Sequence, residues 1–305
     1  MRVPRSHHRP ALLAGKIFAG RDALRCGLLT KSGLRSKAWR HLFRGVYADA
    51  RIKVTHLRRS MAAGWYLLPA SAALAGRSAA TIYGITIARP TDPIDVVVPA
   101  HDRFGTVDGL RIHVGELPAE DVRVRADARV TTPLRTCWDL ANWLDPVEAV
   151  VYIDAMLSWR LVRRNDLVAY GEARANTRGV RAFERAVALA DPGAESPQES
   201  RLRARLVLAG VPRPVTQYVI ERAGAFVARV DLAWPDCRVA VEYDGVWHAG
   251  SDEQIHHDRQ RLNELVATGE WVVLHVTARR LRDDFDGFVR EFRTALQAGS
   301  RSFTE

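Results

Sequence analysis

Two apolar runs near the C-terminus carry carboxylates where buried strands would place apolar side chains. The stretch RVDLAWPDCRVAVEYDGVWH, residues 229–248, holds Asp231 in its first run and Glu242 and Asp244 in its second. A charge buried without a partner costs several kcal/mol. If these runs are strands, the chain must bring their carboxylates to the edge of a sheet, to water or to a bound cation.

Strand geometry predicts which of these acids lie together. Side chains alternate in direction along a strand, so Glu242 and Asp244 share one face and Asp231 points away from its apolar neighbours. If the two strands are adjacent, all three carboxylates can converge, and Glu199 on the preceding predicted helix can reach the same place. Such acids repel one another unless they share a cation, and Mg²⁺, with Mn²⁺ as a substitute, suits oxygen ligands. The alternative is a solvated strand edge with ordinary surface acids.

A cluster of Pro, Gly and Ser at residues 191–197 is the clearest boundary in the chain. Beyond it, residues 195–298 show the pattern of a domain in the order αβββαβα. A metal held at its acids could polarise a phosphoryl oxygen and generate hydroxide. This favours Mg²⁺-dependent hydrolysis of phosphodiester bonds in DNA.

Positive charge is concentrated at the N-terminus. Residues 1–60 contain 15 Lys and Arg but only two acids, Asp22 and Asp49. The apolar spacing predicts three short helices and a small β element, the order of a winged helix-turn-helix, with the last helix beginning near Ser36 and entering the major groove of DNA. The side chains expected to contact DNA are Lys31, Arg35, Lys37, Arg40 and Arg44. The alternative is a small basic helical domain that binds protein or has no binding partner.

The middle of the chain, residues 61–190, mixes helical and strand patterns. Strands are predicted at residues 94–100 and 110–117, and a capped helix at 131–144. The uncharged run at 61–76 is expected to be a buried helix, because a membrane span needs about 20 residues. No catalytic constellation stands out, so a structural, partner-binding or ligand-sensing role is expected here.

The overall composition narrows the partner and the compartment. The 305 residues carry a formal net charge of +10, which favours a polyanionic partner, nucleic acid before an anionic membrane surface. The three cysteines are far apart and form no CxxC pair, so neither a disulfide framework nor a zinc site is indicated. We therefore expect a cytoplasmic protein with no membrane partner.

Two known families resemble different parts of this chain. RVDLAW and VAVEYDG, with an acid on the helix before them, resemble the PD-(D/E)XK nuclease arrangement, and residues 195–295 are similar to the very-short-patch-repair-endonuclease-like family. The upstream region, with its helix-turn-helix pattern, SAATIYG and TTPLRTCWDLA, resembles the AbiEi-type antitoxin family over most of residues 15–190. The same two-part layout is found in uncharacterised actinobacterial proteins.

These resemblances imply an α/β fold with three parts. Residues 1–60 would be a winged helix-turn-helix, residues 61–190 an AbiEi-like mixed α/β domain, and residues 195–298 a restriction-endonuclease-like αβββαβα domain. Asp231 and Glu242 would then be metal ligands in the catalytic site. Glu199 would be an outer acidic ligand or a residue that orients water.

The chain departs from the nuclease pattern at one catalytic position. The superfamily expects a lysine two residues after the glutamate, where this chain has Asp244, and no lysine follows Lys53. The missing positive charge is expected from His248, which could act as acid or base near neutral pH, or from Arg261 or Arg259. The alternatives are that His248 caps a turn and that Arg261 pairs with Asp258 on a helix.

The leading hypothesis is a DNA-binding protein with a Mg²⁺-dependent endonuclease-like domain. The alternative is a non-enzymatic transcriptional regulator or antitoxin of a toxin–antitoxin system, with a degenerate nuclease domain. A third hypothesis is that the middle domain binds and neutralises a cognate toxin. The missing lysine favours the second hypothesis, whereas the three retained acids favour the first.

Overall fold

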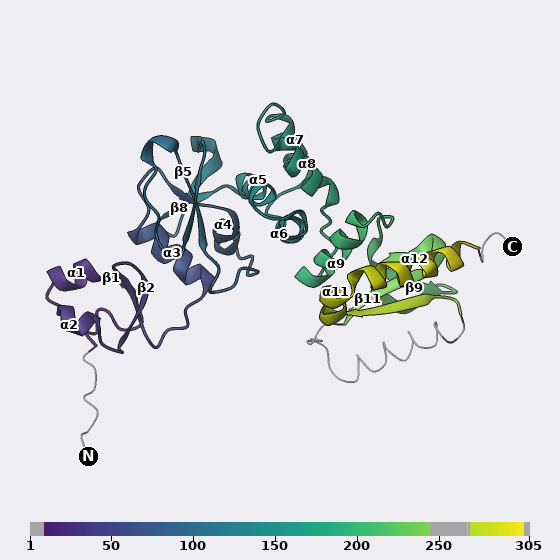
Figure 1. The fold of residues 1–305 in the computed structure, drawn as a ribbon, viewed down its shortest axis with the longest axis horizontal. Helices are drawn as coiled ribbons and strands as arrows, with labels where there is room; N and C mark the ends of the chain where they lie inside the picture. The colour runs from purple at the N-terminus through teal and green to yellow at the C-terminus, as the bar shows by residue number, and fades with distance from the viewer. Residues whose placement is uncertain (1–8, 245–266, 268, 302–305) are drawn as a thin grey trace, which may run out of the picture. The chain divides into compact units, whose positions relative to one another are not determined.

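The computed structural model describes residues 9–244, 267 and 269–301, and Figure 1 shows its helices and strands. The chain is divided into two compact units, residues 1–143 and residues 144–305. Each unit combines helices with β-sheet, so the predicted α/β fold class is confirmed.

The first part of the N-terminal unit is a small antiparallel sheet with two short helices. Its elements are β1 (Ile17–Ala19), α1 (Gly20–Arg25), α2 (Lys31–Leu34), β2 (Trp39–Phe43) and β3 (Val46–Asp49). The strand order is β1-β3-β2, so β2 is an edge strand. The Thr30 hydroxyl caps α2 by accepting a hydrogen bond from the Gly33 amide. Phe18 packs edge-on against Trp39 and stacks on Tyr47, with ring centroids 5.0 and 6.0 Å apart, and these contacts form the centre of a small core.

The third helix predicted for this segment is wrong, because its residues form strand β2 and the turn after it. Leu42 and Phe43 fit a helical spacing from Ala38, but residues 39–43 pair antiparallel with β3. Gly45 has φ +78°, a left-handed conformation that glycine adopts without strain and that closes the tight turn between the strands. Pairing satisfies the backbone and buries Trp39 and Phe43, which outweighs the local helical pattern.

The remainder of the N-terminal unit is a five-stranded sheet with helices. Its elements are α3 (His56–Tyr66), β4 (Ala73–Leu74), α4 (Gly76–Ile82), β5 (Ile94–Val98), β6 (Leu110–Val114), β7 (Val122–Arg125), β8 (Ala128–Thr131) and α5 (Pro133–Trp143). The strand order is β6-β5-β4-β8-β7, and every residue of β5 is buried. The strands predicted at 94–100 and 110–117 and the helix predicted at 131–144 are confirmed.

Two features of this sheet differ from the sequence expectation. The helix expected over residues 61–76 ends at Tyr66, because Pro69 lacks an amide hydrogen and disfavours helical backbone before it, and the chain then enters β4. The hairpin of β7 and β8 was not expected, since alternating Val and Arg over a few residues is a weak strand signal. Its turn is made by Ala126 and Asp127, both with positive φ.

The C-terminal unit begins with four helices. These are α6 (Pro146–Ser158), α7 (Arg164–Glu172), α8 (Val180–Leu189) and α9 (Pro197–Leu208). Asp145 caps α6 by accepting the amides of Val147 and Glu148, and Ser196 caps α9 by accepting the amide of Glu199. Each cap is followed by proline at the first helical position, where a missing amide hydrogen costs nothing.

The same unit ends in a four-stranded sheet with helices on one face. Its elements are β9 (Val215–Arg222), β10 (Ala225–Trp234), β11 (Val239–Asp244), β12 (Val272–Thr277), α11 (Ala278–Asp283) and α12 (Phe285–Arg301). The order is β12-β11-β10-β9, with β11 and β12 parallel and the other pairs antiparallel. Side chains from α9, α11 and α12 pack on one face of this sheet to form its main core. The helix predicted between β11 and β12 lies outside the described residues.

Across the ranges that the structure describes, every helix is too short or too polar to cross a membrane.

Candidate functional sites

The small sheet β1–β3 and helices α1 and α2 form what we call the N-terminal module. The five basic residues predicted to contact DNA all lie on its surface. Lys31 begins α2, Arg35 follows that helix, Lys37 precedes β2, Arg40 lies in β2, and Arg44 lies in the β2–β3 turn. Each of the five is exposed, and none has an ion pair or hydrogen bond through its side chain with another described residue. Their charges are therefore available to a partner.

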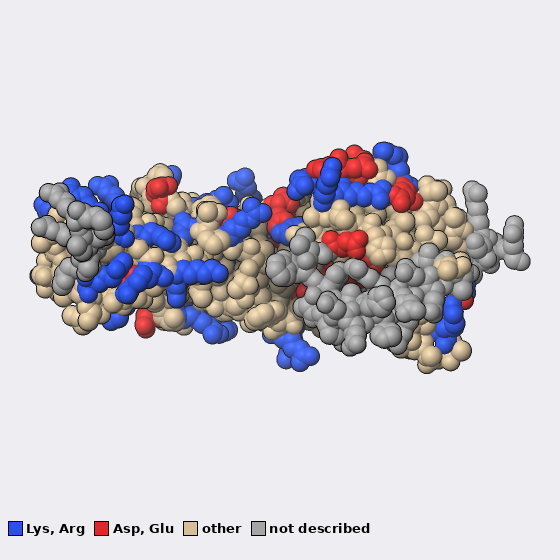
Figure 2. Space-filling model, turned by 90° about the horizontal axis from the view of Figure 1, so that it is seen from below, with Lys and Arg blue, Asp and Glu red and all other residues tan. Residues whose placement is uncertain are grey.

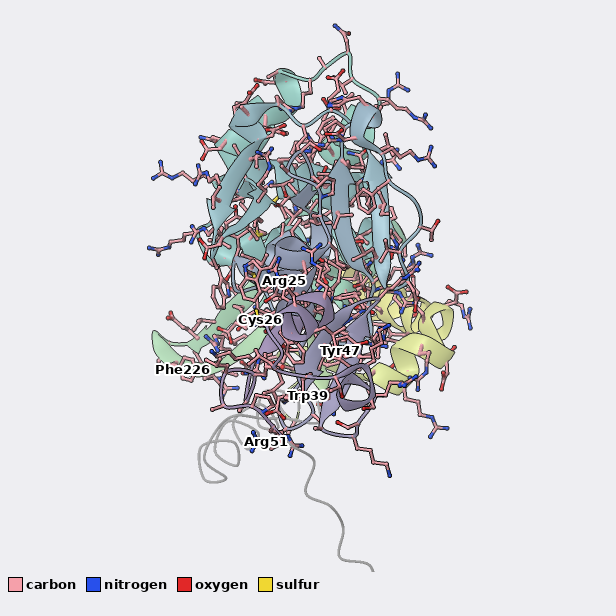
Figure 3. The ribbon with its side chains drawn as sticks, turned by 90° about the vertical axis from the view of Figure 1, so that its left-hand side faces the viewer. Arg25, Cys26, Trp39, Tyr47, Arg51 and Phe226 are labelled. Carbon is pink, nitrogen blue, oxygen red and sulfur yellow. The ribbon has the colours of Figure 1, made fainter. Side chains whose placement is uncertain are left out.

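The acids of this module do not offset that charge. Arg51 hydrogen bonds hold the pKa of buried Asp49 well below its usual range, and the Gly15 amide also donates to this carboxylate. Asp22 forms an ion pair with Arg25 at 3.0 Å. Figure 3 labels Arg25 and Arg51 in this part of the chain. Both acids are thus already paired, and the predicted DNA-contacting residues keep their positive field.

Charge is distributed unevenly between the two units. Residues 1–143 contain 23 Lys and Arg against 11 Asp and Glu, a formal charge of +12, whereas residues 144–305 contain 22 against 24, a charge of −2. Figure 2 shows Lys and Arg crowding the left-hand part of the visible surface, where the N-terminal unit lies. The attraction for a polyanion therefore belongs to the N-terminal unit.

A second candidate site lies in the C-terminal sheet, where β10 and β11 bring two predicted acids together. Leu232 pairs with Val241 in the register of these strands, which places Asp231 beside Glu242. Asp231 Oδ2 accepts a hydrogen bond of 2.8 Å from the Tyr243 amide. The side chains of Asp231 and Glu242 also share a hydrogen bond. The two carboxyl groups are therefore direct neighbours.

Gln217 in β9 connects this pair to the third predicted acid, Glu199. Its amide nitrogen Nε2 donates to Glu199 Oε2 at 3.1 Å and to Asp231 Oδ1 at 3.3 Å. The Glu195 amide donates to the same Glu199 oxygen at 2.8 Å. Three of the acids that the sequence analysis placed at one site, Glu199, Asp231 and Glu242, thus converge, and Gln217 is a member of the group that it missed.

The backbone of the sheet is distorted at this point. Gln217 has φ +50°, a conformation that costs a non-glycine residue about 1–2 kcal/mol. Val230 and Ala233 belong to one apolar cluster although residues three apart on a regular strand face opposite sides. Strain of this kind concentrates at functional sites. Here it lies where Asp231 and the Gln217 amide meet.

Burial makes these carboxyl groups weak acids. The pKa of Glu242 is raised from 4.5 to about 8, first by burial and then by the charge of Asp231. Burial also raises the pKa of Asp231 and that of Glu199 above their ordinary values. Near neutral pH the pair therefore retains a proton, which Glu242 donates to Asp231.

Asp244, in the position where the nuclease superfamily has lysine, pairs with a histidine of the neighbouring strand. Its Oδ1 is 3.3 Å from Nδ1 of His275 in β12, and both side chains are about half exposed. The parallel register places His275 directly beside Glu242. The sequence analysis missed His275, because the pairing of β12 with β11 cannot be read from WVVLHVT. The other predicted catalytic residues, His248, Arg261 and Arg259, lie outside the described residues.

The donor chemistry at this site suits a hard divalent cation, but the geometry is incomplete. Asp231 and Glu242 offer carboxylate oxygens, and buried carboxyl groups with raised pKa values gain from a shared cation. In the described part of the chain, however, no three His, Cys, Asp or Glu side chains are arranged to hold a metal. The Gln217 amide stands between Glu199 and Asp231 instead.

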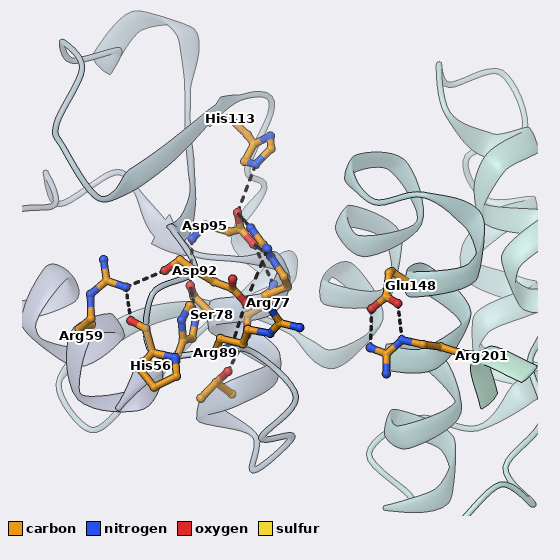
Figure 4. Close-up of polar contacts among 12 residues, drawn as sticks. His56, Arg59, Arg77, Ser78, Arg89, Asp92, Asp95, His113, Glu148 and Arg201 are labelled. Atoms are coloured by element: carbon orange, nitrogen blue, oxygen red, sulfur yellow. Dashed lines mark hydrogen bonds and ion pairs between the residues drawn. The ribbon is translucent and has the colours of Figure 1, made fainter. Parts of the chain in front are cut away.

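A buried polar network around Asp95 in β5 was also missed by the sequence analysis (Figure 4). Arg77 donates to both oxygens of Asp95, at 2.8 and 3.1 Å, and His113 Nε2 lies 3.8 Å from Oδ1. Burial alone would raise the pKa of Asp95, but His113 and Arg77 outweigh it and hold the pKa below its ordinary value. The His113 ring stacks on Trp143. The network ties α4, α5 and β6 to the centre of the sheet and is a structural core.

Two ion pairs join helices α6 and α9 within the C-terminal unit. Glu148 and Arg201 form a two-bonded pair, which Figure 4 shows, with Arg201 Nη2 donating to Oε2 at 2.7 Å. Arg203, which is fully buried, donates to Asp154 at 2.7 Å. Glu199 lies on the same helix, α9. The position of that acid is therefore fixed by helix α6, upstream of the nuclease-like sheet.

Comparisons with known proteins identify relatives of this chain. Residues 71–191 match the AbiEi antitoxin C-terminal domain. The "Uncharacterized protein Rv2248" of Mycobacterium tuberculosis (strain ATCC 25618 / H37Rv) is 34% identical over 207 residues, which are 67% of this chain and 74% of the relative. The "Uncharacterized protein MT2308" of strain CDC 1551 / Oshkosh matches to the same extent. No solved structure matches the chain.

The antitoxin resemblance of the upstream region is thereby confirmed for residues 71–191, whereas the repair-endonuclease resemblance of residues 195–295 stays a prediction. The matched segment includes the five-stranded sheet with its Asp95 network and continues through helices α6, α7 and α8. The chain belongs to the family of these mycobacterial proteins, and its residues 71–191 are similar to the AbiEi antitoxin C-terminal domain.

Proposed function

We propose that this protein is a DNA-binding antitoxin-type regulator and one component of a toxin–antitoxin pair. The observation that carries the proposal is the match of residues 71–191 to the AbiEi antitoxin C-terminal domain. The charge distribution supports the DNA-binding part, because the N-terminal unit has a formal charge of +12. A field of this sign attracts the phosphate backbone of DNA.

Co-expression tests the antitoxin part of the proposal. The gene encoded beside this one is induced alone and together with it in a bacterial host. We expect the neighbouring gene to arrest growth and this protein to restore it. A gene chosen at random elsewhere in the genome, expressed in the same way, serves as the control. Growth arrest that this protein leaves unchanged would contradict the antitoxin function.

A gel-shift or anisotropy titration tests the DNA-binding part. The full chain is expected to bind duplex DNA with an affinity that falls steeply as salt rises, because binding releases counterions from phosphates. The quadruple variant Lys31→Ala, Arg35→Ala, Arg40→Ala and Arg44→Ala should fold normally and bind DNA weakly. All four residues are exposed and have no described side-chain partner, so their loss costs the fold little.

A second candidate function is metal-dependent cleavage of DNA at the acid site in the C-terminal sheet. The convergence of Glu199, Asp231 and Glu242 favours it. Asp231 and Glu242 would hold Mg²⁺ or Mn²⁺, with Glu199 as an outer acid. A bound cation of this kind polarises a phosphoryl oxygen and lowers the pKa of water. The chain itself would supply Gln217 to position Glu199 and Asp231, and His275, oriented by Asp244, to move a proton.

Electrostatics decides the order of the two candidates. Residues 195–305, which contain the acid site, have 15 Lys and Arg against 17 Asp and Glu. This domain has no excess positive charge with which to hold DNA against its own acids, whereas residues 1–60 have a large excess. The antitoxin function therefore ranks first, and a nuclease would depend on the N-terminal module to deliver its substrate.

The nuclease candidate is tested with supercoiled plasmid and Mn²⁺. Nicking or cutting is expected to disappear in Asp231→Ala and Glu242→Ala, while DNA binding survives. Asp244→Ala is the informative comparison, because this acid orients His275 and is not one of the proposed metal ligands, so its loss should reduce rather than abolish activity. Equal cleavage by all four proteins would identify a contaminating nuclease.

A further inference from the structure

The basic surface of the N-terminal module has two parts that differ in shape. Helix α2 has four residues, so it is about 6 Å long and carries only Lys31 and, just beyond its end, Arg35. A helix of one turn reaches few base edges in a major groove. The hairpin of β2 and β3 carries Arg40 and Arg44, with Lys37 two residues before its first strand.

Strand β2 presents its charges along a free edge. It is the last strand in the order β1-β3-β2 and pairs only with β3 among the described residues. Arg40 is exposed on this strand, and its neighbour His41 is exposed as well. Three exposed cationic residues, Lys37, Arg40 and Arg44, therefore lie just before, within and just after this edge strand, within eight residues.

The turn at the end of β2 is fixed by a backbone hydrogen bond and has free space on its outer side. The Gly45 carbonyl accepts a hydrogen bond of 2.8 Å from the Gly20 amide, which fixes the turn against the start of α1. A Cβ placed on Gly45 would meet no other atom within 4 Å, so the space beside the turn is clear. Arg44, the other residue of this anchored turn, is itself exposed.

We propose that the β2 edge and the β2–β3 turn, rather than helix α2, are the main DNA-binding element, and that Arg44 enters the minor groove of the duplex. The inference rests on the proposed DNA binding and names the element responsible for it. A narrow minor groove has an enhanced negative potential that attracts arginine, whose guanidinium is weakly hydrated and enters at lower cost than the lysine ammonium. Arg40 and Lys37 contact the flanking phosphates.

Charged residues on an edge strand can also serve to prevent pairing with another sheet. A single charge on β2 would be enough for that purpose. Here the charge continues from the edge into the turn, and both acids of the module are neutralised by Arg25 and Arg51. The positive charge of this surface is therefore larger than protection of an edge strand requires.

Two double variants of the full chain test the inference. Arg40→Ala with Arg44→Ala removes two charges from the hairpin, and Lys31→Ala with Arg35→Ala removes two charges from the α2 region. The second pair is a matched control, since all four residues are exposed and have no described side-chain partner. Binding to a fluorescein-labelled A·T-rich duplex is measured by anisotropy at several KCl concentrations. Circular dichroism and thermal melting confirm that each variant is folded.

We expect the affinity of the hairpin variant for DNA to fall by about tenfold or more, and the slope of log affinity against log salt to be reduced by about 2. The affinity of the α2 variant should fall by about threefold or less. Netropsin, which fills the minor groove, should displace the unaltered protein, and methyl green, which fills the major groove, should not. A larger loss in the α2 variant, or displacement by methyl green alone, would overturn the inference and leave DNA binding intact. An unaltered protein that does not bind DNA would overturn both.

Discussion

Replacement of Glu242 by glutamine should stabilise the protein, and increasingly so as pH rises. Folding raises the pKa of this carboxyl group from 4.5 to about 8, so the folded chain binds its proton more tightly than the unfolded chain. The stability of the folded state therefore falls as pH increases between those two values. Glutamine keeps a hydrogen-bond donor toward Asp231 and has no proton to lose.

The structure bounds the size of this effect. A shift of about 3.5 pKa units corresponds to at most about 5 kcal/mol of stability lost by pH 8.5. The measured difference will be smaller, because Glu242 remains partly exposed and shares its proton with Asp231. We expect Glu242→Gln to be more stable than the unaltered protein by about 1–3 kcal/mol at pH 8.5, with a smaller difference at pH 5.5.

Urea unfolding at pH 5.5, 7.0 and 8.5 in the presence of a chelator measures this difference. Asp244→Asn is the matched control, since Asp244 is about half exposed and contacts His275, and it should leave the pH dependence unchanged. If Glu242→Gln is less stable than the unaltered protein at pH 8.5, or if the stability of the unaltered protein does not fall with pH, the reasoning is refuted. Mn²⁺, if the second candidate function holds, should stabilise the unaltered protein more than the variant.

Three further predictions concern other parts of the chain. Arg203→Met should destabilise the protein by about 3–5 kcal/mol in urea unfolding, because it leaves Asp154 buried without its partner; a loss below about 1 kcal/mol would contradict the role given to this pair. Gly45→Ala should cost about 1–2 kcal/mol through backbone strain alone, since its new methyl group meets no atom, and an unchanged melting temperature would argue against the left-handed turn. A thiol reagent should modify exposed Cys26 in the native protein and reach Cys137 only on unfolding, because burial excludes the reagent and raises the pKa of that thiol; rapid native modification of Cys137 would show that the core is open.

The sequence was most informative where one pattern extends over many residues. The helix at 131–144 and the strands at 94–100 and 110–117 were predicted near their observed bounds, since their apolar patterns are strong. Strand alternation led to the group of Asp231, Glu242 and Asp244, to which Glu199 was added from the preceding helix. The structure links Glu199, Asp231 and Glu242 and pairs Asp244 with His275. The role of the three linked acids as metal ligands stays a prediction.

Long-range pairing and local strain could not be read in this way. Strand β2 resembled a helix because its stability comes from pairing with β3 across a turn, not from its own spacing. The left-handed backbone of Gln217 has no signature in a strand sequence, and the position of His275 depends on a parallel register set by a distant connection. Sequence reasoning finds the acids, whereas their polar partners follow from the tertiary fold.

The two ion pairs between α6 and α9 have a consequence for how this protein can be divided. A fragment that ends between residues 190 and 195, at the boundary that the sequence suggests, would keep Asp154 but lose Arg203, its buried partner. The complementary fragment would keep a fully buried arginine with no carboxylate. A cut between residues 143 and 144 separates neither pair. We therefore expect that two folded fragments are obtained when the chain is divided between residues 143 and 144. This position lies within the antitoxin-matched segment, not at its end.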